Sequence, residues 1–520
     1  MSVYTGSNNG FMQSTYVDQQ GTALPGDLAY ASDVDLIDAC VVSMPAGSEG
    51  DLLPVGVGVV GAYSADASRP GMTSVKVSPV GADTTAAQLY GVTVRNQQCR
   101  TDGNNVSGWG DGDVCNVMRT ARVGGRIAGA LAVDISTEQP AFVPVRAKTV
   151  LLATGLTHRL YMNASTPGFM FNTGHCPNCA GGQGLGWRVG ARMVNMEFPY
   201  THAGPKYLQR CGKATWIGVY RYPDGKLLGP FVDKATREVG DITCDVWNSA
   251  YTDVWNSVFE DVMRKGTGPA YMDCSDATDE QMAYMRWAMT GEGLTALLTY
   301  MEKEGIDPQK HGVEFMRYEP ILHGRGLDVS DEGETSVPGL FAAGDLVGNG
   351  GCGIALAAYL GWEGGMTAAA QAATVDFQPA EETESIRKRM ELLSSFMDRP
   401  EGADWKDANM ALQQIMSDYA PAGPVKVRSE TLLNAGRDYL KQLRHSAERQ
   451  MGATCSHTLM RAAEVLDLMD CGEAIMNAAL ARQETRANHV RSDFPFTNPL
   501  LADKFLTVGL EGDEVVARWR

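Results

Sequence analysis

The pattern of apolar and polar positions changes along the 520-residue chain. Residues 1–117 contain short apolar patches broken by Gly, Pro, Asn and Ser, which predict loops and short strands with few helices. Residues 126–134 and 144–153 are rich in Ala, Val and Leu, and they predict a β-hairpin followed by a buried strand. From 381 to about 488, apolar residues recur at helical spacing and predict three or four helices.

Glycine-rich turns precede two further predicted helices. Residues 181–193 (GGQGLGWRVGARM) predict a turn that leads into a helix, and residues 337–373 predict a strand, a glycine-rich loop and a long Ala-rich helix. Between them, residues 197–330 mix aromatics, Gly and Pro with short helices at 279–290 and 294–304. This middle segment is typical of a separate α+β lobe.

Composition and charge exclude several classes of protein. The chain has 44 Lys and Arg against 62 Asp and Glu, a net charge of −18, which argues against general nucleic-acid binding. The imbalance is uneven, because residues 1–117 hold twelve acidic and four basic residues. The sequence contains no apolar run long enough to predict a direct membrane span, and no export signal is visible. The eleven cysteines are typical of reduced thiols. We therefore expect a cytoplasmic protein.

The segment with the most specific chemistry is 335–355. An apolar stretch ends at Gly344 and Asp345, and further glycines lead into the predicted helix. Glycines let the backbone approach a flat or phosphate-bearing ligand, Asp345 can accept hydrogen bonds from ribityl hydroxyls, and a helix N-terminus offers free N–H groups. Together with Thr154 and Gly155 after an earlier strand, the pattern indicates flavin binding. A sharp strand–helix turn without a ligand is the alternative.

The sequence here resembles the flavoprotein subunits of succinate dehydrogenase and fumarate reductase, and it is most similar to the adenylylsulfate reductase α-subunit branch. The segments GRIAGALAVD, VLLATG, GLGWRVGARMVNMEF, TSVPGLFAAGD and ARQETRANHVRSDFP follow the family's order over about residues 123–500. The last of them carries the family's helical-domain pattern at Glu484, Thr485, Arg486, His489, Arg491, Asp493 and Pro495.

The resemblance implies an α/β fold with a Rossmann-like FAD-binding domain, an inserted α+β capping domain and a C-terminal helical domain. The expected boundaries are 1–196 for the first part of the FAD-binding domain, with 1–117 atypical, 197–320 for the capping or substrate domain, 321–378 for the second part, and 379–520 for the helical domain. The FAD is expected to be non-covalent, because no histidine motif for covalent attachment is recognisable. The expected FAD-binding residues are Thr154, Gly155, Gly182, Gly344, Asp345, Gly353, Ile354 and Ala355.

His323, Arg325 and His202 are the candidates for catalysis. The family places substrate-facing residues near the first two, where a histidine can move a proton and an arginine can hold an anion beside a hydride transfer. The alternative is that His323 and Arg325 are surface residues of a turn around Gly324 and Gly326, and that His202 is a capped loop histidine.

The chain departs from the dicarboxylate enzymes of this family at several positions. Those enzymes carry an arginine shortly after the flavin loop, whereas residues 352–356 contain no cation. Two carboxylates need paired cations, so the departure puts succinate and fumarate in doubt. Lys206, Arg210 and Lys213 form a basic cluster that holds an anionic substrate or lies on a solvated loop.

The Cys176-x-x-Cys179 segment occupies the position of the family's glycine-rich turn. We interpret it as a structural turn with reduced thiols and expect no metal site. Half a metal or cluster site and a redox dithiol remain alternatives. A full metal site would need two more ligands; no second C-x-x-C exists, and Cys211 and His202 are the nearest candidates.

The family's opening strand, G-x-G-x-x-G loop and helix are missing from the first 40 residues. The only match is formed by Gly56, Gly58 and Gly61, which are therefore the candidate phosphate loop and are also expected to bind the cofactor, although the Pro70-Gly71 pair would break the helix that should follow. A diverged N-terminus, a first strand supplied by another chain and an incorrect reading frame are the alternatives.

The sequence as a whole predicts an FAD-dependent oxidoreductase subunit of the fumarate reductase or adenylylsulfate reductase type. It would move electrons between a small anionic substrate and a partner that carries iron–sulfur clusters. The alternative is a non-catalytic flavin-fold scaffold or electron-relay subunit, and a self-contained soluble reductase is a third possibility.

Overall fold

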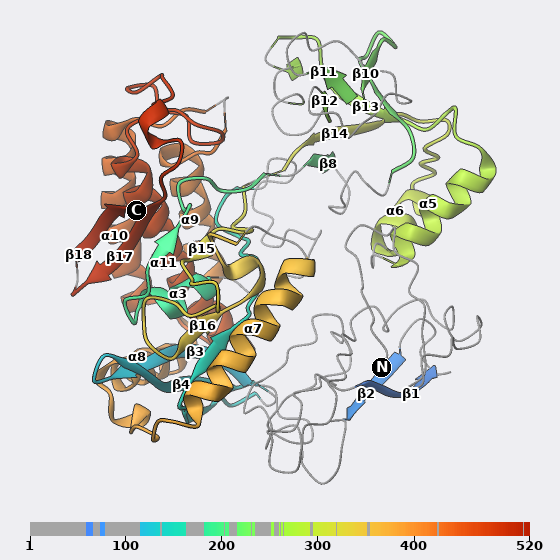
Figure 1. The fold of residues 1–520 in the computed structure, drawn as a ribbon. Helices are drawn as coiled ribbons and strands as arrows, with labels where there is room; N and C mark the ends of the chain where they lie inside the picture. Colours follow the sequence, from blue (N-terminus) through green and yellow to red (C-terminus); the bar gives the residue numbers. More distant parts are fainter. Residues whose placement is uncertain are drawn as a thin grey trace.

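The computed structural model describes most of the chain from residue 115 onward (Figure 1). The described residues are 59–65, 73–78, 115–135, 138–162, 181–201, 203–206, 216–229, 231–233, 251–253, 259, 262–263, 265–291, 295–318, 320–350, 354–423, 426–512 and 514–520.

A three-stranded antiparallel sheet opens the well-described part. It contains β3 (Cys115–Val123), β4 (Arg126–Asp134) and β5 (Ala141–Arg146), in that order. The two-residue turn between β3 and β4 consists of glycines with φ of 58° and 86°, the left-handed backbone that tight hairpins favour. The antiparallel pairing of β4 with β5 agrees with the predicted hairpin, whereas β3 was not predicted. The predicted strand at 144–153 is divided between the end of β5 and the separate strand β6 (Val150–Leu152).

Strand β6 pairs in parallel with β16 (Leu340–Ala342), which lies far along the chain. Helix α7 (Ile354–Ala372) packs against both strands, and Figure 1 shows it running along this part of the fold. All three residues of β16 are buried, as expected for a strand covered on both faces. The predicted strand, loop and long helix at 337–373 are confirmed.

A second sheet joins the chain's C-terminus to residues near its middle. Its order is β15 (Gly326–Leu327), β7 (Met193–Val194), β17 (Leu506–Glu511) and β18 (Glu514–Trp519). The expectation of a purely helical segment at 379–520 is therefore wrong at its end. Leu506 and Val508 alternate inward from β17 and are buried against the main core, which selects a strand.

Four helices make up the segment between 384 and 481. They are α8 (Glu384–Met397), α9 (Trp405–Tyr419), α10 (Glu430–Gln450) and α11 (Ser456–Ala481). The side chains of Thr383, Asp404 and Ser429 each accept a backbone N–H at the start of α8, α9 and α10. Helix α11 is buried on nearly all sides and packs on α9, α10 and the short helix α3 (Gly182–Trp187).

Buried ion pairs also attach α11 to its neighbours. Arg389 of α8 donates to Asp467 Oδ1 at 3.1 Å, and Arg188 donates through Nε to Asp470 Oδ2 at 2.7 Å. Arg444 of α10 also donates to Asp470 Oδ1, at 2.5 Å. Because α3 precedes Arg188 directly, these contacts hold the glycine-rich turn of residues 181–187 against the helical segment.

The middle segment forms a lobe with its own core. Its five-stranded sheet has the order β10 (Leu227–Gly229), β9 (Val219–Arg221), β13 (Ala270–Asp273), β14 (Val313–Arg317) and β8 (Ala203–Pro205). Helices α5 (Asp279–Gly291) and α6 (Thr295–Lys303) agree with the predicted helices at 279–290 and 294–304. A hydrophobic cluster rich in methionine and aromatic residues lies between Trp216 and Phe315 and is separate from the main core.

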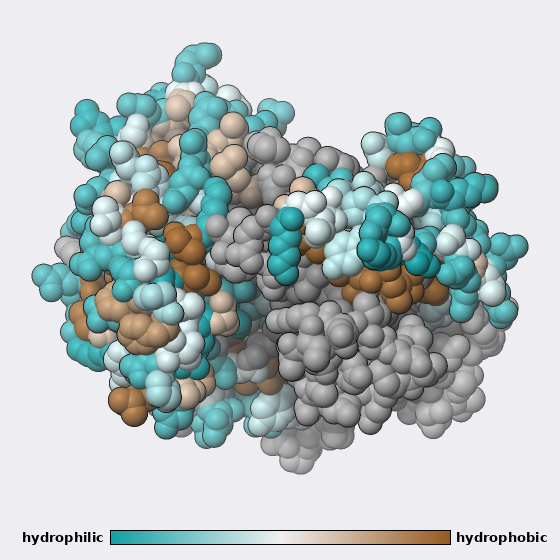
Figure 2. All heavy atoms as spheres, turned by 90° about the horizontal axis from the view of Figure 1, so that it is seen from above, coloured by the Kyte–Doolittle hydropathy of each residue, from teal (hydrophilic) through white to brown (hydrophobic). Residues whose placement is uncertain are grey.

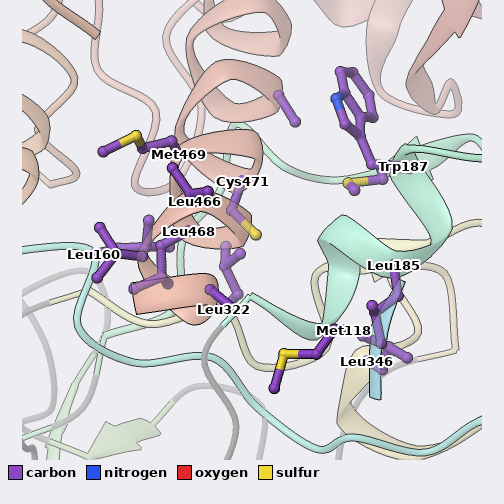
Figure 3. Packing of buried hydrophobic residues seen from close by; sticks show 14 of the residues in the cluster. Met118, Leu160, Leu185, Trp187, Leu322, Leu346, Leu466, Leu468, Met469 and Cys471 are labelled. Atoms are coloured by element: carbon purple, nitrogen blue, oxygen red, sulfur yellow. The ribbon is translucent and has the colours of Figure 1, made fainter. Parts of the chain in front are cut away.

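The main core is continuous from Met118 to Val508. Figure 3 shows Leu185 and Trp187 of α3 together with Leu466 and Cys471 of α11 in this cluster. The segments expected to be flavin-binding and helical domains therefore share one core. Four strands lie outside these sheets and form two antiparallel pairs: β1 (Val59–Ala65) with β2 (Thr73–Ser78), and β11 (Phe231–Asp233) with β12 (Tyr251–Asp253).

Apolar side chains are largely withdrawn into the two cores. On the face drawn in Figure 2, hydrophilic residues predominate among the coloured atoms and apolar residues form small areas. Within the described ranges, no helix has the length and hydropathy to cross a lipid bilayer. Cys274 and Cys455 are free thiols.

Candidate functional site

The candidate site lies where the two parallel strands end. Leu152 of β6 pairs with Ala342 of β16, and the N–H of Ala343 donates to the carbonyl of Leu152 at 2.9 Å. Parallel strands place their carboxyl ends at the same edge of a sheet, where ligands of such folds bind. The structure therefore brings the Thr154–Gly155 loop and the Gly344–Asp345 loop to one edge, as the two motifs predict.

Both loops use backbone that favours glycine. Gly155 has φ of 74° and Gly344 has φ of 72°. A Cβ atom added to Gly155 would meet nothing within 4 Å, so there is open space beside this loop. The hydroxyl oxygen of Thr154 is buried and makes no hydrogen bond to the residues that the structure describes. A buried polar atom without a bond beside open space fits a polar ligand at this edge.

His323 lies directly beside the second loop. Its Nε2 is 3.1 Å from Asp345 Oδ1, and the backbone N–H of Gly324 donates to the Asp345 carbonyl at 2.9 Å. The Tyr200 ring packs edge-on against the imidazole, with 5.1 Å between ring centroids. A carboxylate on one ring nitrogen and an aromatic ring beside it fix the orientation of the imidazole, as a proton-transfer group requires.

Arg325 is held by backbone carbonyls. Its Nε donates to the carbonyl of Phe198 at 2.7 Å and its Nη1 to that of Gly324 at 2.6 Å. The side-chain amide of Gln183 donates in turn to the Arg325 carbonyl at 3.1 Å. The arginine thus joins the 324–326 turn to the segment that carries Tyr200.

Thr157 and Gln183 belong to the site although the motifs do not reveal them. The Thr157 hydroxyl donates to Gln183 Oε1 at 2.7 Å and accepts from the N–H of Gly181 at 3.2 Å. The backbone of Thr157 also pairs in both directions with Leu322. The only sequence signal is position, because Thr157 follows the Thr154–Gly155 loop and Gln183 follows the glycine turn.

Gly348 connects the loop that follows Asp345 to the four-stranded sheet that contains β15 and β7. Asn195 donates through Nδ2 to the Gly348 carbonyl at 2.8 Å, and the Gly348 N–H donates to the Leu327 carbonyl at 2.8 Å. Helix α7 then begins at Ile354, so Ile354 and Ala355 open the helix as predicted.

The structure places the other candidates as follows. Gly182 begins α3, between Gly181 and Gln183, which both bond Thr157, and all six residues of α3 are buried. Gly61 lies inside β1, which pairs with β2, whereas a phosphate loop would place it at a turn into a helix. Lys206 pairs with Glu314 at 2.7 Å. The remaining candidates lie outside the described residues: Gly56, Gly58, Cys176, Cys179, His202, Arg210, Cys211, Lys213 and Gly353.

Residues 482–486 support the candidate site through buried ion pairs to the segment that leads to Tyr200. Arg482 donates through Nε to Glu197 Oε1 at 2.6 Å and through Nη1 to Glu484 Oε1 at 2.6 Å. Arg486 donates to both oxygens of Glu484, at 2.8 and 3.0 Å. Arg482 is 2% exposed and both glutamates are fully buried, so these pairs are enclosed by protein. They tie the C-terminal segment to the stretch that leads to Tyr200.

His489 is a buried neutral histidine. Arg428 lies 2.8 Å from its Nδ1, and a guanidinium has only donors, so Nδ1 accepts and Nε2 donates to the Arg482 carbonyl at 2.9 Å. Burial and the charge of Arg428 lower the pKa of His489 to about 2. Nearby, Arg491 donates to both oxygens of Asp493, and this holds the pKa of Asp493 at about 2. The family pattern at 484–493 is thus a structural network.

His489 predicts a pH dependence of stability. In the unfolded chain its pKa is near 6.5, whereas the folded pKa is about 2. As the pH falls below 6.5, only the unfolded chain binds the proton. The free energy of unfolding should therefore decrease by about 1.4 kcal/mol per pH unit from this group. Denaturant titrations between pH 7 and pH 5 measure it.

The His489→Gln variant should lose this component of the slope, and His445→Gln, at an exposed histidine, should keep it. Equal slopes in both variants would contradict the assignment.

Comparisons with known proteins give two matching families. Residues 409–509 match the model described as the C-terminal part of the fumarate reductase flavoprotein. Residues 12–187 match a model of phage structural cement proteins. The second match includes the segment for which the motifs show no flavoprotein resemblance, and it also overlaps β3 to β6 and α3.

Similar proteins are flavoproteins. The chain is 25% identical over 383 residues to an uncharacterized FAD-dependent oxidoreductase of Methanocaldococcus jannaschii, in a match that covers 72% of this chain and 65% of that protein. It is 24% identical over 409 residues to a subunit of the CoM/CoB fumarate reductase of Methanothermobacter marburgensis, covering 72% and 66%. The chain thus spans slightly less than two thirds of the length of either relative.

Solved structures agree on the fold. Adenylylsulfate reductase of Archaeoglobus fulgidus superposes with a TM-score of 0.63 at 20% identity, covering 78% of this chain and 72% of that one. The quinol fumarate reductase flavoprotein of E. coli gives a TM-score of 0.58 at 18% identity, covering 78% and 70%. The resemblance to the fumarate reductase and succinate dehydrogenase flavoproteins, a class of FAD-dependent oxidoreductases, is confirmed.

Proposed function

We propose that this chain is an FAD-dependent oxidoreductase subunit that moves electrons between a small anionic substrate and an iron–sulfur partner. The observation that carries the proposal is the meeting of two glycine loops at one sheet edge with His323, which is paired to Asp345 at 3.1 Å. A flavin-binding role explains the space beside Gly155, and a proton-transfer role explains the fixed imidazole.

Thr154, Gly155, Gly344 and Asp345 would hold the flavin, together with Ile354 and Ala355 at the start of α7 and with Gly353, which lies outside the described residues. The buried hydroxyl of Thr154 and the open space beside Gly155 fit such a group. When bound, FAD supplies a hydride acceptor or donor. The sequence contributes no histidine motif for covalent attachment, so the cofactor is non-covalent.

The residues around the flavin edge have separate tasks. His323 moves a proton to or from the substrate, with its ring oriented by Asp345 and Tyr200. Arg325, held on the carbonyls of Phe198 and Gly324, presents positive charge beside the reacting anion. His202, which lies outside the described residues, stays a candidate for catalysis from the sequence alone.

The division that we propose for this function is an FAD-binding domain at 1–196 and 321–378, a capping domain at 197–320, and a C-terminal domain at 379–520 whose helices are followed by the strands β17 and β18 and which shares its core with the first domain. A hydrophobic core of its own supports the independence of the capping domain. Substrate would bind between this lobe and the flavin edge.

Electrons leave the flavin through a partner protein. No group of three or more His, Cys, Asp or Glu side chains within the described ranges could hold a metal ion. The relative from Methanothermobacter marburgensis is named as one subunit of its fumarate reductase. We therefore expect the partner to be an iron–sulfur protein. Co-purification from the native host, followed by iron analysis, tests this expectation.

Flavin binding and the role of His323 are tested together. The purified protein should contain or take up FAD that is released on denaturation. The His323→Asn variant should keep its flavin, whereas reoxidation of the reduced flavin by the physiological anionic acceptor should slow about 10²–10⁴-fold. His311→Asn, at an exposed histidine of the lobe, is the matched control and should leave both properties unchanged.

A protein that takes up no FAD from an excess would refute the proposal. Equal reoxidation rates in the His323→Asn and His311→Asn variants would refute the assignment of His323.

A non-catalytic scaffold is the second candidate, and the match of residues 12–187 to structural cement proteins favours it. A scaffold would assemble with its partners without flavin, or with a flavin that no donor reduces. The same flavin measurements therefore separate the two functions.

A further inference from the structure

A cavity lies apart from the residues of the flavin edge. Its volume is about 590 Å³, within the range of small-ligand pockets. The turn after α3, the end of β3, the β17–β18 hairpin and the start of α8 form its walls. None of the residues assigned to the flavin edge lines it.

Four arginines line this cavity in a chain of net charge −18. They are Arg122, Arg188, Arg192 and Arg518, and among the described residues the lining contains one acidic residue, Glu511. Arginine is the side chain whose planar fork best matches a phosphate or carboxylate. Such a concentration of one charge in an acidic protein marks an anion site.

The arginines are held in place by different contacts. Arg122 donates through Nη1 to the Val189 carbonyl at 2.8 Å, which leaves its positive charge uncompensated by that bond. Arg192 lies on the cavity with its Nε 4.0 Å from Asp328, a carboxylate that also pairs with Arg520. Arg188 shares the carboxylate of Asp470 with Arg444, and Arg518 pairs with Glu511 at 2.5 Å. Arg122 and Arg192 are therefore the principal anion-binding groups.

Neutral donors complete the lining. Ser336, Ser385 and Thr507 contribute hydroxyl groups. Ser385 lies in the first turn of α8, a fourteen-residue helix whose N-terminal N–H groups favour negative charge. The glycines at 190, 509 and 512 also line the cavity and have no side chains that would fill it. Small hydroxyl donors around two arginines match the several oxygens of a phosphate group.

We propose that this cavity binds a small phosphate monoester of about mononucleotide size, separately from the redox substrate. A phosphate monoester carries a charge of about −1.5 to −2 at neutral pH. This charge complements Arg122 and Arg192, and the remaining volume accommodates the organic part of the ligand. The proposal does not depend on flavin binding.

Titration calorimetry of the full-length protein with uridine 5′-monophosphate, inorganic phosphate and succinate tests the ligand class. Uridine 5′-monophosphate should bind, and inorganic phosphate should compete with it, because both offer the same phosphate oxygens. Succinate should not compete. Binding of succinate alone, or of none of the three, would overturn the proposal.

Charge variants test the location. Arg122→Gln and Arg192→Gln should each weaken the binding of uridine 5′-monophosphate about tenfold, whereas Glu511→Gln should tighten it, because it removes an acidic group that pairs with Arg518 in the lining. Arg286→Gln, at an exposed arginine of the lobe, is the matched control. Circular dichroism shows whether each variant is folded. Unchanged affinity in the folded Arg122→Gln and Arg192→Gln variants would overturn the assignment to this cavity.

Discussion

Replacing Arg482 by methionine is expected to lower the free energy of unfolding by about 3–5 kcal/mol, because it leaves the buried carboxylate of Glu197 without its ion-pair partner, whereas Glu484 keeps Arg486. Arg482 is 2% exposed and bonds Glu197 and Glu484, both fully buried, at 2.6 Å each. Methionine fills a similar volume, so the change removes charge and hydrogen bonds more than packing. Equilibrium unfolding in denaturant measures the loss.

The matched control is Lys388→Met. Lys388 pairs with Glu384 at 2.7 Å on the outside of α8, where both side chains are largely exposed. An exposed pair of this kind contributes about 0.3–0.5 kcal/mol. If both variants lost the same small amount, the Arg482 network would not be the buried support described above. Adding Glu197→Gln to Arg482→Met should recover part of the loss, because one unpaired charge disappears.

The Arg482 variant should also disturb the candidate site. Glu197 begins the stretch that leads to Tyr200, and the Tyr200 ring packs on His323. The carbonyl of Phe198 in the same stretch accepts from Arg325. Because the C-terminal segment holds this stretch in place, damage at Arg482 reaches both proposed catalytic groups without touching them.

The sequence predicted the parts of the site whose cause is local. Gly155 and Gly344 could be recognised because each needs left-handed backbone directly after a strand. The start of α7 at Ile354 followed from the same glycine-rich pattern. Turn conformation and helical periodicity depend on neighbouring residues, so a single sequence is sufficient to predict them.

Contacts between distant segments could not be predicted in this way. Thr157 and Gln183 carry no motif, and their bond forms only because α3 is held against α11. Asp345 was expected to serve ribityl hydroxyls, and its carboxylate also lies beside His323. The strands at 506–519 are short and were hidden in a helical segment, since their stability comes from pairing with β7.

The N-terminal glycine pattern shows the limit of a motif without context. Gly61 has the required spacing, but in the structure it lies within the β1–β2 pair. A G-x-G-x-x-G pattern indicates phosphate binding only between a strand and a helix. The match of residues 12–187 to another family agrees with the absence of that context.

Replacing Gly348 by alanine is expected to destabilise the protein by about 3 kcal/mol and to abolish flavin binding. A Cβ atom there would overlap the carbonyl oxygen of Val194 and lie 2.7 Å from both the N and the O of Gly326. All three neighbours are backbone atoms, so no side chain can move aside. The loop after Asp345 must shift instead, and this loop is the proposed contact with the cofactor.

Gly365→Ala is the control with the opposite sign. Gly365 lies inside α7, and a Cβ atom there would meet nothing within 4 Å. Alanine favours a helix over glycine by up to about 1 kcal/mol, so this variant should be as stable as the original protein or more stable. Denaturant unfolding and the FAD content of both variants are compared. A Gly348→Ala protein that keeps its stability and its flavin would show that the loop does not depend on the close approach of Gly348 to β7 and β15.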